Sequence, residues 1–250
     1  MNKNFKKYSL EFLVIIFGIL VSFFLEERRQ NSIEISKKND SIKQLLKVIE
    51  EDLNQIDRFI DLQNFSLNSC NLIFENLKKN NIMSNDSIIY HLSSVGRGLR
   101  SFFPQEGVFN QLISSDLIKR IDSEDLKINL FKLFNEDLKR HEVHTKEYDV
   151  YFLDFNYKLS VNFFLEDEWS IEPDPINVQS YRFNQKYYFS DSMYGDLIEL
   201  KSSMISYIKE LEELKKTYLS LQNLCNEELN VRYYSKNFFG ILGKSLSAFL

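Results

Sequence analysis

Apolar residues recur along much of this chain at alternating steps of three and four, the spacing of one face of an α-helix. The longest series runs near the C-terminus: Leu197, Leu200, Met204, Tyr207, Leu211, Leu214, Tyr218, Leu221 and Cys225. A second series lies nearer the N-terminus: Ile42, Leu46, Ile49, Leu53, Ile56 and Ile60. Two such seams predict long helices that pack as an antiparallel pair in a bundle, with a two-chain coiled coil as the alternative. Flanking apolar residues such as Leu45 and Ile208 favour the bundle, because they widen both stripes.

The remaining pattern predicts further helices joined by short breaks. The first seam belongs to a predicted helix over about 33–77, which ends before the turn-like stretch NNIMSND. Ser123 and Ser190 are predicted to cap the helices that follow them. Shorter helices are expected over 87–103, closed by Pro104, and over 106–118.

The stretch 155–165 has two possible interpretations, a strand or a helix. Its apolar residues alternate with a period of two, as in a strand, and a hairpin with 180–189 would give that strand a partner. The resemblance described below favours a helix, which is the prediction, and 166–188 is expected to form an irregular loop. With few glycines and prolines in the chain, the fold class is all-α.

Tyr8 to Leu25 is an apolar run of 18 residues with a single ionisable group, Glu11. A helix of that length reaches about 27 Å, close to the thickness of a bilayer core. A cleaved signal peptide is the competing interpretation, but FFLEERRQ has no small residues for a cleavage site. The sequence therefore predicts an N-terminal transmembrane helix. The apolar tail 230–250 is expected either to lie at the membrane interface or to dock on the bundle.

Basic residues flank this apolar run on both sides. They therefore do not by themselves decide which end of the predicted transmembrane helix lies in the cytoplasm. The C-terminal side carries more Lys and Arg, whereas Lys3, Lys6 and Lys7 are packed into a seven-residue tail that resists translocation. We expect the basic N-terminal tail to lie in the cytoplasm and the helical part of the chain after the apolar run to lie outside the cytoplasm.

Gly18 and Ser22 stand four positions apart within the apolar run, on one helical face. Small residues at this spacing let two membrane helices approach closely, and Glu11 lies near the same face. Glu11, Gly18 and Ser22 are thus the predicted helix-pairing face, for a second copy of the chain or a partner membrane protein. The alternative is that Gly18 is an ordinary glycine of a membrane helix and Glu11 lies at headgroup level.

The segment LEFLVIIFGILVSFFLEERR resembles the start of a family of uncharacterised bacterial single-pass membrane proteins. Matching residues are Glu11, Gly18, Ile19, Leu20, Glu27 and Arg28, whereas Leu10 and Ser22 stand where that family tends to have glycine and alanine. A second likeness covers 102–141. The resemblance implies a bacterial inner-membrane protein with one N-terminal anchor and a helical body, and it implies no activity.

Charge and cysteine content argue against two classes of protein, those that bind nucleic acid and those built around a zinc site. A net charge of −5 argues against nucleic acid as a partner. Cys70 and Cys225 lie far apart and lack the CxxC spacing of a zinc site, so they predict neither a zinc site nor a disulfide framework, and a single disulfide between them stays open as an alternative.

Candidate catalytic and metal-binding groups are few. His141 and His144 are three positions apart, unlike the histidines of HExxH, so a solvated helix face is expected rather than a metal site. The carboxylates Asp167, Glu168, Glu172 and Asp174 lack an EF-hand pattern. No phosphate-binding or nucleophile-elbow motif is present. No metal, cofactor or catalytic residue is predicted, and the protein is not expected to be an enzyme.

These observations predict a basic tail at 1–7, a transmembrane helix at 8–25, a helical bundle at 26–229 and an apolar tail at 230–250. The predicted function is a membrane-anchored interaction protein, that is, a scaffold, sensor or accessory subunit. The alternative is a ligand-binding receptor or enzyme whose pocket lies between the bundle and the aromatic segment 148–188, with Trp169 and tyrosines as walls.

Overall fold

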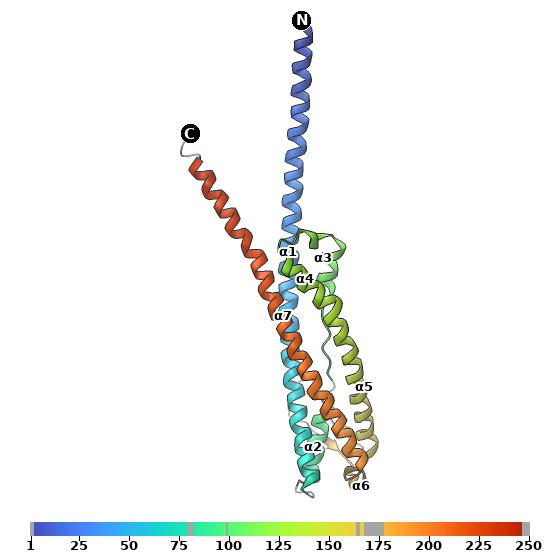
Figure 1. Cartoon of the computed structure of the whole chain (residues 1–250). Coiled ribbons are helices and arrows are strands. Elements are labelled where there is room, and N and C mark those ends of the chain that lie inside the picture. Colours follow the sequence, from blue (N-terminus) through green and yellow to red (C-terminus); the bar gives the residue numbers. More distant parts are fainter. Residues whose placement is uncertain (1–2, 80–82, 99, 164–165, 168–177, 247–250) are drawn as a thin grey trace. The chain divides into compact units, whose positions relative to one another are not determined.

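The structure, a computed structural model, describes residues 3–79, 83–98, 100–163, 166–167 and 178–246, with side chains at 8, 11–79, 83–98, 100–163 and 180–230. Its architecture is all-α (Figure 1). The helices are α1 (Lys3–Lys78), α2 (Asn85–Gly96), α3 (Gly107–Ser114), η1 (Leu117–Arg120, 3₁₀), α4 (Glu124–Lys132), η2 (Leu133–Asp137, π), α5 (Leu138–Phe163), α6 (Gln185–Tyr188) and α7 (Asp191–Leu246). Two short strands, β1 (Glu166–Asp167) and β2 (Val178–Ser180), pair antiparallel within the predicted loop.

Several predicted elements form as expected. The seam predicted over 33–77 lies in α1, and the Ser123 hydroxyl accepts the Leu126 amide at 3.1 Å at the start of α4. Ser190 caps α7 in the same way through the Met193 amide, at 3.2 Å. Residues 155–163 are helical, because Phe155, Leu159 and Phe163 recur at the four-residue step that places them together on the buried face.

Several boundaries differ from the predictions. The helix predicted over 87–103 ends at Gly96, and residues 100–106 have no regular structure, because Pro104 lacks an amide for a helical hydrogen bond. The helix predicted over 106–118 ends at Ser114 and is followed by η1, and the short helix α6 lies within the loop predicted at 166–188. Helix α7 continues to Leu246, through most of the tail predicted as a separate segment at 230–250.

The apolar run and the first seam belong to a single helix, α1, rather than to two helices separated near residue 30. The connecting stretch EERRQNS contains neither glycine nor proline, and most of its residues favour helices. Nothing in it interrupts the backbone hydrogen bonds of the helix.

The chain divides into two compact units. The first contains residues 1–46, 107–127 and 224–250, and the second contains 47–106 and 128–223. Helices α1 and α7 each contribute to both units.

In the second unit, α1 and α7 run antiparallel. The Tyr218 hydroxyl reaches Asp52, the Cys70 thiol reaches the Leu197 carbonyl, and the Phe74 ring meets the Tyr194 ring edge-on. Higher residue numbers in α1 thus contact lower residue numbers in α7, as in an antiparallel pair of helices.

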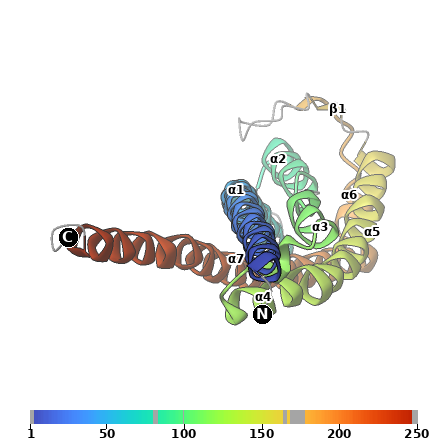
Figure 2. The same cartoon turned by 90° about the horizontal axis from the view of Figure 1, so that it is seen from above.

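Helix α5 also runs antiparallel to α7 in this unit, with Lys158 bound to Asp196 and His141 to Glu210 (Figure 1). Helix α2 lies against α1, where Ser66 donates to the Ser94 carbonyl (Figure 2).

Both predicted seams are buried within the single chain. Every member of the C-terminal seam is at most 5% exposed. In the first seam Ile42, Ile49, Leu53 and Ile56 are buried, while Leu46 and Ile60 are half-buried and the flanking Leu45 is buried instead. This burial confirms the wide stripe of an intramolecular bundle rather than a narrow two-chain seam.

The first unit is built from the N-terminal part of α1, α3, η1, the start of α4 and the C-terminal part of α7. Its core contains Ile42, Leu45, Phe109, Leu112 and Cys225. Lys38 of α1 is fully buried and forms an ion pair with Glu228 of α7. The Glu228 carboxylate also accepts the backbone amides of Asp122, at 3.0 Å, and Ser123, at 2.9 Å. One buried carboxylate therefore joins three segments of this unit.

Among the described residues, no helix combines the length and the apolar character needed to cross a membrane.

Candidate functional site

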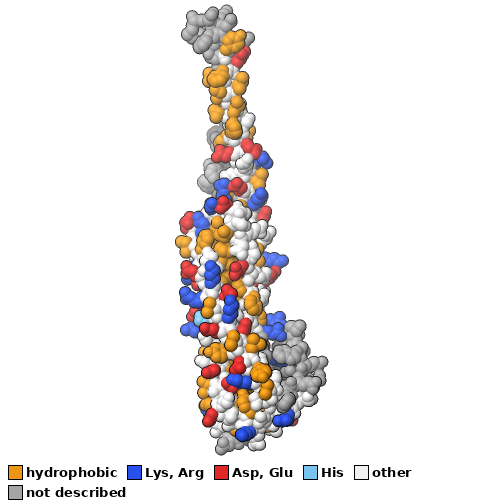
Figure 3. All heavy atoms as spheres, turned by 90° about the vertical axis from the view of Figure 1, so that its right-hand side faces the viewer, with side chains coloured by type: hydrophobic (Ala, Val, Ile, Leu, Met, Phe, Trp, Pro, Cys, Tyr) orange, Lys and Arg blue, Asp and Glu red, His pale blue; other side chains and the backbone are white. Residues whose placement is uncertain are grey.

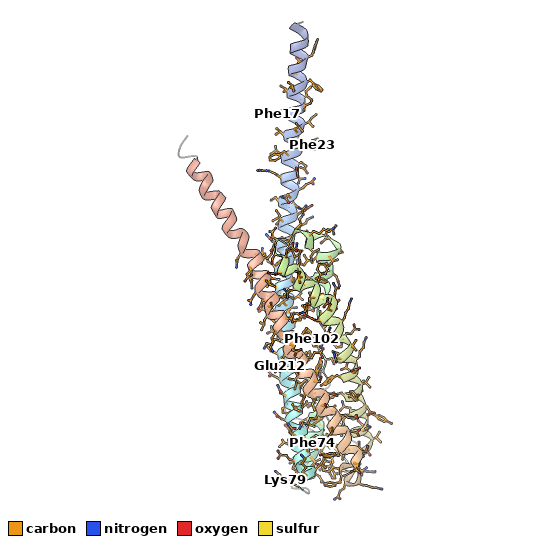
Figure 4. The ribbon with its side chains drawn as sticks, viewed as in Figure 1. Phe17, Phe23, Phe74, Lys79, Phe102 and Glu212 are labelled. Carbon is orange, nitrogen blue, oxygen red and sulfur yellow. The ribbon has the colours of Figure 1, made fainter. Side chains whose placement is uncertain are left out.

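Among the described side chains of the first unit, the most exposed apolar surface is the stretch of α1 from Phe12 to Leu25. Phe12, Phe17 and Phe23 are 63–70% exposed, and the other large apolar side chains of this stretch are all at least 37% exposed. Figure 3 shows hydrophobic side chains along the face of this stretch that is turned to the viewer, and Figure 4 shows Phe17 and Phe23 extending from the helix. A helix that is apolar on every side is typical of a buried or membrane-embedded segment.

Gly18 and Ser22, two of the predicted pairing residues, lie on one face of this stretch. The Ser22 hydroxyl donates to the Gly18 carbonyl at 2.9 Å, and a Cβ atom built on Gly18 would have no neighbour within 4 Å. The small side chains leave a shallow hollow, which is lined by Ile15, Gly18, Ile19, Ser22, Phe23 and Glu26. Because Ser22 donates within its own helix, this face presents a close-approach surface rather than an unsatisfied donor.

Glu11, the third predicted residue, lies seven positions before Gly18 and is exposed. Seven residues are almost two helical turns, so Glu11 is near the same face. Charged residues return at the other end of the stretch, where Arg29 binds Glu26 through two hydrogen bonds and the Arg28 guanidinium lies 4.7 Å from the Phe24 ring centroid. The apolar stretch is thus bounded by charges on both sides.

The second unit has a polar network that sequence reasoning did not find. It surrounds Gly98 and residues 100–106; the latter have no regular structure, and the Phe102 side chain is buried in the core. The Gly98 carbonyl accepts Gln63 Nε2 at 2.6 Å and the Tyr148 hydroxyl at 2.7 Å. The Phe102 amide donates to the Tyr207 hydroxyl at 2.9 Å, and the Gln105 amide donates to Asp52 Oδ2 at 3.3 Å.

Such contacts are required here, because a buried backbone group without a partner costs free energy. Gly98 also needs to lack a side chain, because a Cβ atom there would lie 2.9 Å from the Phe152 ring. The need to pair buried backbone groups therefore explains this network. The network gives no indication of a catalytic or binding role.

His141 belongs to this network and is buried, so the expectation of a solvated face was wrong for this residue. Its Nδ1 lies 3.1 Å from Glu210, and its Nε2 lies 3.2 Å from the Phe102 carbonyl and 3.1 Å from Thr145. His144 is exposed. The two histidines are not brought together, and His141 serves to hold the core segment.

Burial also changes acid–base properties around the network. It raises the pKa of Tyr207 to about 12 and the pKa of Asp52 above its ordinary value. Hydrogen bonds from Tyr218 and Gln105 to Asp52 Oδ2 oppose the second shift. Oδ1 of Asp52 has no hydrogen-bond partner among the described residues.

The raised pKa of Asp52 predicts a pH dependence of stability. A carboxyl whose pKa is higher in the folded state stabilises the fold most when protonated, and that contribution is lost as pH rises through the folded pKa. The free energy of unfolding should therefore fall less steeply above pH 4 in Asp52→Asn than in the unchanged protein. Urea unfolding between pH 4 and 7 measures both slopes. Asp57→Asn, at an exposed carboxylate, is the control, and identical slopes in Asp52→Asn and the unchanged protein would contradict the prediction.

No metal site is assembled in the part of the chain that the structure describes: no group of three or more His, Cys, Asp or Glu is placed to hold an ion. Glu168, Glu172 and Asp174 lie outside the described residues, as does the side chain of Asp167.

One hollow lies near the site of the alternative pocket predicted beside 148–188. The hollow there is lined by Tyr151, Asp154, Phe155, Asp196, Glu199 and Leu200 and encloses about 10 Å³. This is room for about one water molecule rather than for a ligand. Trp169, its expected wall, lies outside the described residues.

Comparison with protein-family models, with curated proteins and with solved structures found no match.

Proposed function

We propose that this chain is a membrane-anchored helical interaction protein, a scaffold, sensor or accessory subunit without catalytic activity of its own. In this proposal Tyr8–Leu25 crosses the bacterial inner membrane once, and the helical body lies outside the cytoplasm. The observation that supports it is the exposure of apolar side chains on every side of α1 between Phe12 and Leu25.

The free energy of burial favours a membrane location for this stretch. Removing a large apolar side chain from water is worth roughly 1.5–3 kcal/mol, and the stretch carries many of them. A helix satisfies its own backbone hydrogen bonds, so it can enter lipid without further partners. The proposed span also includes Ser9 and Leu10, whose side chains lie outside those that the structure describes. With them it has 18 residues, within the range of spanning helices.

The pairing face is proposed to bind a second copy of the chain or a partner membrane protein. In lipid there is no hydrophobic force between helices, so close backbone approach is the main source of affinity. Gly18, with open space where its Cβ would be, permits that approach.

The anchor is tested by introducing charge into the apolar stretch. Val14→Arg with Ile19→Arg is expected to release most of the protein from membranes washed with alkaline carbonate, because an arginine at the bilayer centre costs roughly 2.5–3.5 kcal/mol. Ile205→Arg with Leu219→Arg, at two exposed positions of α7, is the matched control. Release of the unchanged protein, or retention of the Val14/Ile19 variant, would contradict the anchor.

The pairing face is tested separately by Gly18→Leu with Ser22→Leu. Crosslinked species formed in the membrane by the unchanged protein should disappear, while Ile19→Leu should preserve them. If the crosslinked species persist in the double variant, the pairing face is wrong and the anchor is unaffected.

A further inference from the structure

Helix α5 of the second unit has a second apolar stripe, on the face opposite its core. Its members are Val143, Val150, Leu153, Tyr157 and Val161, which are 51–68% exposed. The buried residues of α5, among them His141, Tyr148 and Phe152, occupy the other side of the helix. Figure 3 looks toward α5 and shows hydrophobic side chains interspersed with charged ones.

The spacing of this stripe matches a helix-packing seam. Val143, Val150 and Tyr157 are seven apart, and Leu153 and Val161 occupy intervening steps of three and four. They cover about 27 Å along the helix. Lys146 takes the one remaining seam position, where its long aliphatic stem can lie along apolar surface.

The charged residues beside this stripe limit which kind of partner surface can bind to it. Carboxylates flank its central part on both sides: Glu142 and Asp149 on one, Glu147 and Asp154 on the other. Lys146 binds Glu142 and Lys158 binds Asp154, each at 2.7 Å, so some of this charge is neutralised within the helix. Glu147 is exposed and Asp149 half-buried. The borders of the stripe remain acidic on balance.

A second copy of α5 is a poor match for these borders. In a parallel pair, flanking positions five apart face each other, which sets Glu142 opposite Glu147 and Asp149 opposite Asp154. In an antiparallel pair centred on Val150, Glu147 faces Asp154. Like charges meet in both arrangements, and they discriminate against pairing. An anionic lipid surface is disfavoured for the same reason.

We propose that the outer face of α5 is a docking surface for an amphipathic helix of another protein, one whose apolar seam is bordered by Lys and Arg. This inference rests on the proposed function as an interaction protein and names one of its partner-binding surfaces. It does not depend on the pairing face of α1.

The test uses the full chain in nanodiscs and two synthetic three-heptad peptides. Both peptides have Leu at the seam positions; one has Lys and the other Glu at the flanking positions. Fluorescence anisotropy of the labelled peptides measures binding. We expect saturable binding of the Lys peptide and at least tenfold weaker binding of the Glu peptide.

Variants then locate the binding. Val150→Gln with Leu153→Gln, both at exposed positions, should abolish binding of the Lys peptide without affecting the fold. Glu147→Lys with Asp154→Lys should weaken the Lys peptide about fivefold and strengthen the Glu peptide, as expected for two surface charge pairs. Glu212→Lys with Glu213→Lys, an equal change of net charge on α7, should leave both affinities unchanged.

Three results would overturn the proposal. They are absence of saturable binding, binding that survives the Val150/Leu153 variant, and self-association of the chain that this variant abolishes in sedimentation. The last result would assign the face to a second copy. The carbonate wash of membranes described above tests the membrane anchor separately, so a failure of the anchor is distinguishable from a failure of the docking surface.

Discussion

Replacing Phe102 with alanine is expected to lower the free energy of unfolding by about 3–5 kcal/mol, the usual cost of truncating a buried phenylalanine. Phe102 is 1% exposed and its ring lies 5.6 Å from the His141 ring and 6.2 Å from the Tyr218 ring, centroid to centroid. Figure 4 shows it among the helices of the second unit. The cavity left by the ring would also loosen the buried backbone groups on either side.

The neighbouring residue is a matched control. Phe103 is 69% exposed, so Phe103→Ala should change the free energy of unfolding by no more than about 0.5 kcal/mol. Urea unfolding of the full chain in detergent micelles, followed by circular dichroism, measures both variants. Equal losses for the two would contradict the placement of the Phe102 side chain in the core.

Replacing Lys38 with methionine should be about as damaging, lowering the free energy of unfolding by about 3–5 kcal/mol. Lys38 is fully buried and pairs with Glu228, which is itself buried in the first unit. Removing the cation leaves a buried carboxylate that still accepts the amides of Asp122 and Ser123. The Asp122 carboxylate also lies 3.9 Å from the Lys38 ammonium, but it is 57% exposed, so water can solvate it after the lysine is removed.

Two further variants separate lost charge pairing from lost packing. Adding Glu228→Gln to the Lys38 variant should recover part of the loss, because the buried charge disappears while one oxygen still accepts an amide. Lys43→Met, at an exposed lysine that pairs with Asp40 at 3.5 Å, should cost less than about 1 kcal/mol. A double variant as unstable as the single one would show that the buried charge is not the cause.

The sequence predicted the seams and the caps well because these features are local. A step of three and four fixes one helical face, and a serine before an apolar run can reach the amide three residues on. Periodicity therefore identified Leu197 and Tyr218 as core residues. The period-two alternation at 155–163 left helix and strand open, because residues four apart such as Phe155 and Leu159 share a helical face as well; the helix that was predicted is the one that forms.

The polar contacts were beyond such reasoning because they join residues far apart in the chain. Lys38 and Glu228 are charged residues within helical patterns. The sequence around each of them gives no sign that its side chain is buried. His141 was expected on a solvated helix face because its spacing from His144 differs from HExxH, and its partner Glu210 is 69 positions away, beyond the reach of a local pattern. The only local signals were the glycines of GRG and Pro104, which marked an irregular segment without indicating that it enters the core.

The proposed anchor is tested most directly by measuring how deep α1 lies in a bilayer. Phe17→Cys and Phe23→Cys, each labelled with an environment-sensitive fluorophore, would be reconstituted in vesicles whose lipids carry bromine at defined depths. The native thiols should stay unlabelled, because Cys70 and Cys225 are buried and burial raises the pKa of both to about 12. A spanning helix predicts that bromine near the bilayer centre quenches position 17 most, and that shallower bromine quenches position 23 most. Quenching of both positions only by shallow bromine, or of neither, would contradict a membrane-crossing helix.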